Sequence, residues 1–168
     1  NAMQEEYISC DLSINGEVFQ SVGVRPKGNS SLSMVASSDS DRYSFKFEFD
    51  QYVKGQTCYG LDKFVVNNMQ SDATYMKEYF SYELMEQMGI PTPLYAFANI
   101  TVNGEDWGFY LAIEALEESF AQRQFGSDYG MLYKPDSMDM GGGRGFEPRE
   151  DGQRRFPESD LRGLQRRR

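Results

Sequence analysis

Residues 25–31 read Arg25-Pro26-Lys27-Gly28-Asn29-Ser30-Ser31, and residues 43–49 read Tyr43-Ser44-Phe45-Lys46-Phe47-Glu48-Phe49. The first segment is a small-residue loop with two cations, and the second alternates like a strand with a lysine at its centre. Glycine and serine let backbone N–H groups approach an anion, and lysine supplies a point charge. Together the two segments are suited to hold a phosphate.

Alternating apolar and polar residues predict strands on both sides of these segments. Asn15-Gly16 and Asn103-Gly104 are strong hairpin signals, because a type I′ turn needs a positive φ at both central residues. The Ser- and Asp-rich residues 29–42 are expected to form a loop, and Phe64-Val65-Val66 is a short apolar run. The expected strands cover residues 8–14, 18–24, 43–49, 95–102 and 107–113, with a further short one at 131–133.

A helix is predicted to begin at Ser71 or Asp72, either of which can cap it, and to end before Gly89. Its apolar stripe is expected to be Met76, Phe80, Leu84 and Met88. A second, short helix is expected over residues 116–123. The fold class is therefore α+β, a mainly antiparallel sheet of about five strands with one long helix.

Composition narrows the range of functions. A length of 168 residues fits one domain with a tail. The net charge of −9 argues against nucleic acid as a general partner. The chain has no histidine, which excludes Ser-His-Asp and Cys-His triads and histidine-ligated zinc sites. Its two cysteines indicate neither a disulfide nor a metal site, and no apolar run is long enough to span a membrane.

The balance of basic and acidic residues changes near the C-terminal end of the chain. Residues 144–168 hold eight Arg and no Lys against five acidic residues, about +3, whereas residues 1–143 sum to −12. We therefore expect a folded domain over residues 1–135. Residues 136–168 are expected to form a Gly/Arg-rich tail, either disordered or not native to the domain; a basic anchor for anionic partners is the alternative. The run from Gly141 to Gly145 lacks the Gly-Lys-Ser/Thr of a P-loop and is interpreted as a linker.

Lys46 is the first candidate site residue. On a helical wheel Glu83 falls about 20° from Met76, inside the expected buried stripe, whereas Glu78 lies on the opposite face. A glutamate on a buried face is costly unless it is paired, and Lys46 is the natural partner. The alternative is that Lys46 is a solvated strand lysine and Glu83 lies at the helix edge.

Arg25, Lys27 and Asn29 form the second candidate site. These residues would grip a phosphate or a partner's carboxylate. The alternative is an ordinary junction between a strand and a loop, and the residue pattern leaves both interpretations open.

Taken jointly, several segments resemble the CotH kinases, a family named for spore coat protein H. The resemblance covers roughly residues 8–145. The matching segments are residues 25–31, 43–47, 59–64 with Asn67-Asn68, 75–93, 102–110 and 132–135.

The resemblance implies an atypical kinase fold, here its small nucleotide-binding lobe, that uses ATP and Mg²⁺ to phosphorylate Ser/Thr of spore-coat or surface proteins. It makes Lys46 the phosphate-contacting lysine and Glu83 its helix partner, and places an adenine-reading hinge from Glu114 to Leu116. The metal-binding and base aspartates are expected in a C-terminal half of the same protein, outside this chain. Asp136 and Asp139 are poor substitutes, so the chain alone is expected to be inactive.

Two hypotheses follow. The first is the nucleotide-binding half of a CotH-like protein kinase, located in the spore coat or at the cell surface. The second is a non-catalytic structural or adhesion module of a bacterial surface protein, in which Arg25 and Lys27 serve packing or partner contacts.

Overall fold

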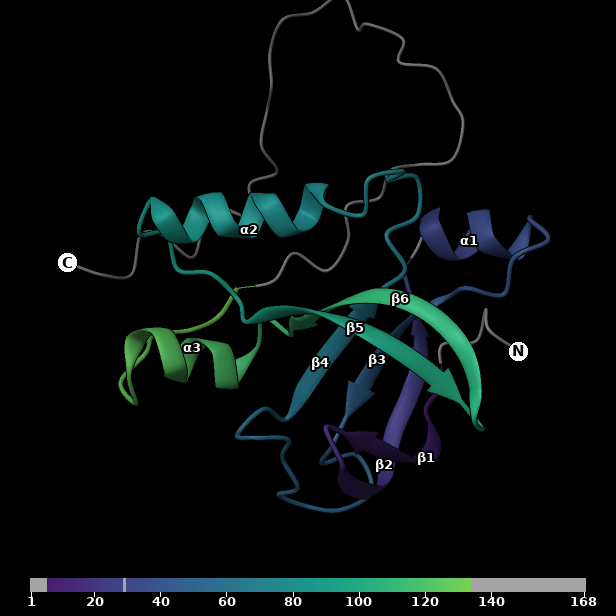
Figure 1. The fold of residues 1–168 in the computed structure, drawn as a ribbon. Coiled ribbons are helices and arrows are strands. Elements are labelled where there is room, and N and C mark those ends of the chain that lie inside the picture. Colours follow the sequence, from purple (N-terminus) through teal and green to yellow (C-terminus); the bar gives the residue numbers. More distant parts are fainter. Residues whose placement is uncertain (1–5, 29, 134–168) are drawn as a thin grey trace, which may run out of the picture. The chain divides into compact units, whose positions relative to one another are not determined.

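The computed structural model describes residues 6–28 and 30–133, and within them a six-stranded antiparallel sheet that curls upon itself (Figure 1). The strand order is β1-β2-β3-β4-β6-β5. The predicted α+β class is confirmed, with six strands rather than about five, because the apolar run at 64–66 is itself a strand. The strands are β1 (Ile8–Ile14), β2 (Glu17–Lys27), β3 (Ser44–Glu48), β4 (Lys63–Asn67), β5 (Tyr95–Val102) and β6 (Glu105–Glu114).

Three helices accompany the sheet in the described part of the chain. They are α1 (Ser30–Ala36), α2 (Lys77–Gln87) and α3 (Glu118–Phe125). None of the described helices has the length and apolar character needed to cross a membrane. All described elements lie in one unit that ends at Leu132.

Strand β2 extends three residues past its predicted end and so places Arg25 and Lys27 on the sheet. Pro26, between them, pairs only with Phe45 of β3, because the β1–β2 ladder ends at the pair Ile8 and Val24. A proline is tolerated where its missing N–H faces no ladder partner. The strand-to-loop junction expected at these residues therefore begins only after Lys27.

The two faces of the sheet bury different residues. One face carries the main core, in which Phe47 of β3 and Phe49, just after this strand, pack with residues of the other strands and with Cys58. The opposite face packs against α2, where Tyr79 and Tyr82 contact a smaller cluster around Leu111 and Ile113. The main core cluster comprises Phe19, Val22, Phe47, Phe49, Cys58, Val66 and Tyr110.

Helix α1 replaces the first half of the loop expected over residues 29–42. It buries Leu32 and Val35, spaced three apart on one side of the helix. Burial of two apolar side chains outweighs the weak helix propensity of the surrounding serines. The short strand expected at residues 131–133 does not form.

Helix α2 begins at Lys77, later than predicted, and its N-cap residue is Met76 rather than Ser71 or Asp72. The Lys77 N–H donates to Asp72 Oδ2 at 2.9 Å across the intervening turn. The predicted apolar stripe was wrong: Phe80, Leu84 and Met88 are 58%, 59% and 66% exposed. Tyr79 and Tyr82 face the sheet instead, and on the helical wheel their mean direction lies about 150° from that of the predicted stripe.

Gly28 follows β2 with φ +112°, and a Cβ added at this position would clash with the Ser31 side-chain oxygen. We expect Gly28→Ala to destabilise the protein by about 1–2 kcal/mol, because a side chain is strained at this φ. Thermal unfolding measures the effect. Gly130→Ala is the matched control, since a Cβ added at Gly130 would meet no other atom within 4 Å and its φ is ordinary. Equal melting temperatures for the two variants would contradict the requirement for glycine at position 28.

Candidate functional site

Cations from three neighbouring strands share the face of the sheet that α2 covers. Arg25 of β2 pairs with Lys46 of β3, which pairs with Val65 of β4, one of the residues packed beneath α2. Lys27 lies two residues beyond Arg25 and therefore points to the same face. We call this region, with Lys63 of β4 at its other end, the polar strip.

The first part of the polar strip is a pocket of about 220 Å³ where β2, β3 and β4 approach α2. The Lys27 ammonium donates to Asn67 Oδ1 at 3.0 Å, and Asn67 Nδ2 donates to both carboxylate oxygens of Glu78 at 3.0 Å. The pocket thus places one cation and one carboxylate among neutral hydrogen-bonding groups. Its lining residues are Lys27, Ser31, Ser44, Asn67, Asn68, Met69, Gln70 and Glu78.

Burial lowers the pKa of Lys27 below its ordinary value, and the charge of Glu78 opposes this only in part. A partly dehydrated ammonium group gains more from an anion than a fully solvated one does. The pocket therefore offers an anion the charge of Lys27, while the Ser44, Asn67 and Asn68 side chains already donate to other groups.

The second part of the polar strip is a network of half-buried ion pairs. Lys46 Nζ lies 3.1 Å from Glu117 Oε1, and Lys63 Nζ lies 2.9 Å from Glu117 Oε2 and 3.2 Å from Glu48 Oε1. Burial alone would lower the pKa of Lys63, but its hydrogen bonds to Glu117 and Glu48 outweigh burial and raise it. Lys63 is thus a permanent cation that shares Glu117 with Lys46.

The network continues to the edge of the described chain through Tyr7. Its hydroxyl donates to Glu48 Oε2 at 2.5 Å, and the Arg25 guanidinium lies 5.5 Å from the centre of its ring. Burial, together with this hydrogen bond, raises the pKa of Tyr7 to about 12. Tyr7 therefore stays a neutral donor over the physiological pH range.

The predicted ion pair between Lys46 and Glu83 is not formed. Lys46 is bound by Glu117, whereas Glu83 accepts hydrogen bonds from Tyr95 Oη at 3.1 Å and from Gln87 Nε2 at 3.2 Å. The rotation of α2 explains the difference, because it brings Glu78 rather than Glu83 to the polar strip. A catalytic role for Lys46 or Glu83 stays a prediction.

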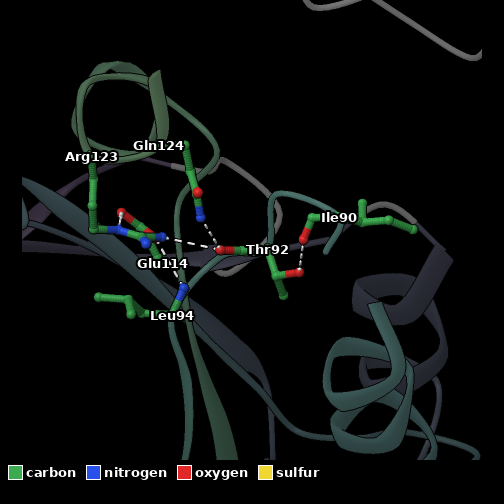
Figure 2. Close-up of polar contacts among 6 residues, drawn as sticks. All are labelled: Ile90, Thr92, Leu94, Glu114, Arg123 and Gln124. Carbon is green, nitrogen blue, oxygen red and sulfur yellow. Dashed lines mark hydrogen bonds and ion pairs between the residues drawn. The ribbon is translucent and has the colours of Figure 1, made fainter. Parts of the chain in front are cut away.

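Glu114, the first residue of the expected hinge, is buried and fully engaged. Figure 2 shows Arg123 of α3 reaching both the Glu114 carboxylate and the Thr92 carbonyl, the latter at 3.1 Å. The Leu94 N–H donates to Glu114 Oε2 at 3.0 Å, and Gln124 also donates to the Thr92 carbonyl, at 2.8 Å. The Glu114 side chain therefore fastens α3 and the segment before β5 to the sheet.

The backbone of the expected hinge is also partly engaged. The Glu114 N–H donates to Leu94 O at 2.8 Å, and the Ala115 N–H donates to Lys63 O at 3.3 Å. Leu116, at the end of the expected hinge, is exposed. Any recognition of adenine by this segment would accordingly fall to Leu116 and the residues after it.

Some expected site residues come together and others are not described. Arg25, Lys27 and Lys46 share the polar strip, but Asn29, Asp136 and Asp139 lie outside the described residues, as does the glycine run at 141–145. Within the described ranges, no three or more acidic or cysteine side chains gather closely enough to hold a metal ion.

Sequence reasoning missed the roles of Glu117 and Glu78. Nothing in the sequence near Glu117 indicates a partner for Lys46, because the two are 71 residues apart. For Asn67 the residue pattern held a weak indication of a role in the site. Its amide side chain directly follows an apolar run, at the point where a strand leaves the core.

Removing the buried Glu114 carboxylate should weaken the attachment of α3. We expect Glu114→Ala to lower the free energy of unfolding by on the order of 3 kcal/mol, because Arg123 and the Leu94 N–H lose their shared acceptor. Chemical denaturation measures the loss. Glu105→Gln, at the exposed start of the same strand, is the control and should change stability little. Equal stabilities for the two variants would rule out this role for Glu114.

Comparison with known proteins gives a family match. No curated protein matches the chain. A family description, CotH kinase protein, matches residues 24–162. The matched range contains the polar strip from Lys27 to Glu117 and runs past the boundary expected at residue 135, so the division into domain and tail stays a prediction. The match covers most of the sequence, and the chain belongs to the CotH kinase family.

Proposed function

We propose that the polar strip binds the phosphates of ATP, with Lys27 and Lys46 as the contacting cations. The observation that carries the proposal is the pocket beside Lys27, where a partly dehydrated ammonium meets hydroxyl and amide groups from α1, β3, β4 and the segment after β4. Lys46 lies on the adjoining strand, and Arg25 pairs with it in the ladder. A chain of phosphates laid along the strip would meet Lys27 first and would then displace Glu117 from Lys46.

Membership in the CotH kinase family supports the rest of the proposed reaction. Phosphoryl transfer to Ser/Thr of coat or surface proteins would take place at the outer end of this phosphate chain, in the spore coat or at the cell surface. Mg²⁺, when bound with ATP, would neutralise charge on the phosphates. Lys27 and Lys46 supply the cations for the phosphates, and we place the ligands of the metal elsewhere in the protein.

ATP should bind weakly to this chain, with a dissociation constant on the order of millimolar, because one wall of a site buries only part of a nucleotide. Lys27→Ala and Lys46→Ala should each weaken binding by about tenfold, since each removes a charge-assisted hydrogen bond to phosphate. Calorimetric titration with and without Mg²⁺ measures the change. Lys54→Ala, in an exposed loop, is the matched loss of one positive charge and should leave binding unchanged.

An equal loss of ATP affinity in Lys54→Ala would mean that ATP binding depends only on the net charge of the chain. Absence of any binding to the unaltered chain would refute the proposal and favour the non-catalytic structural or adhesion module.

A further inference from the structure

We propose that Asn67 is a positioning residue: its amide holds the Lys27 ammonium apart from the Glu78 carboxylate, so that Lys27 stays available to a phosphate. The inference deepens the proposed function and rests on it for the identity of the anion. It assigns a role to a residue that neither binds the reacting groups nor belongs to the core.

The hydrogen bonds of the Asn67 amide support this role. Its Oδ1 accepts from Lys27 Nζ at 3.0 Å, and its Nδ2 donates to Oε1 and Oε2 of Glu78, both at 3.0 Å. This is the one orientation of the amide that satisfies both charges, because its oxygen can only accept and its nitrogen can only donate. The amide thus replaces a direct contact between ammonium and carboxylate.

The backbone of Asn67 is held in the sheet, and its amide is held by the hydrogen bonds to Lys27 and Glu78. Asn67 pairs with Leu111 of β6, which is completely buried, and the preceding Val66 lies in the main core. Lys27, at the end of β2, has the longer and more adaptable side chain. Without the amide, Lys27 is the partner that moves, and Glu78 in the same pocket is the only carboxylate among the described lining residues.

A direct pair would compete with phosphate for the ammonium. An ion pair in a partly dehydrated pocket is stronger than one in water, so an incoming phosphate would have to break it. Hydrogen bonding to a neutral amide leaves the full charge of Lys27 in place. The remaining titratable neighbour, Tyr82, contacts Glu78 Oε1 at 3.4 Å, and burial raises its pKa to about 12, so it stays neutral.

The first experiment measures the protonation of Lys27 without any nucleotide. The rate of acylation of Lys27 by acetic anhydride is followed against pH by peptide mass spectrometry, in the unaltered chain and in Asn67→Ala, Glu78→Gln and the double variant. Asn67→Ala should move the midpoint for Lys27 to higher pH, because a direct pair with Glu78 stabilises the ammonium. The double variant should move it back, because glutamine offers no charge. Lys54 on the same molecules should keep its midpoint throughout.

The second experiment measures ATP binding by the same four proteins. Asn67→Ala should weaken binding by about tenfold, the loss expected when Lys27 is diverted, and Glu78→Gln in that background should recover most of it. A role of Asn67 in folding alone predicts no recovery from a change in α2.

The outcomes separate the two proposals. An unchanged Lys27 midpoint in Asn67→Ala, or a double variant that behaves like Asn67→Ala, would overturn the role of Asn67. The Lys27 acylation midpoints could also move as expected although the chain binds no ATP. That result would refute the proposed function but would still support the role of Asn67.

Discussion

Three half-buried lysines on one face of the sheet are the constraint around which this structure is arranged. Lys27, Lys46 and Lys63 come from three consecutive neighbours in the sheet, and each needs a compensating group, because a charge withdrawn from water is costly. The compensation comes from outside their own strands. Glu78 is supplied by α2 and Glu117 by the connection between β6 and α3. Helix placement is therefore tied to the same contacts that make the site.

The strands could be predicted from the sequence because their pattern is local. Alternation in β3 puts Phe45 and Phe47 on the core face and Lys46 on the other, and the two Asn-Gly turns fix the hairpins. Helix α1 could not be predicted in this way, since its serines favour loops. Only the burial of Leu32 and Val35 favours a helix here. The orientation of α2 could not be predicted from the sequence for a related reason.

The α2 helix carries two candidate faces, one aliphatic and aromatic, one rich in tyrosine and glutamate. The apolar stripe looked like the buried one, yet Tyr79 and Tyr82 pack on the sheet, where ring stacking with Phe97 and Tyr95 and hydroxyl contacts to glutamates combine. The choice depends on residues of β5 and β6 that are distant in sequence. The lysines of the candidate site could thus be predicted, but their partners could not, because partner identity depends on how the helix is rotated.

The Glu114–Arg123 contacts have a mechanical consequence. Arg123 holds β6 through the Glu114 carboxylate and the segment before β5 through the Thr92 carbonyl, while Gln124 grips the same carbonyl. A tilt of α3 would strain both attachments at once, so α3 and the last turns of chain before β5 move as a single piece with the sheet. The short connection from Ala115 to Glu117 is thereby held at both ends, and it carries the carboxylate that contacts Lys46 and Lys63. The anchoring of α3 therefore also fixes the position of a partner of the candidate site.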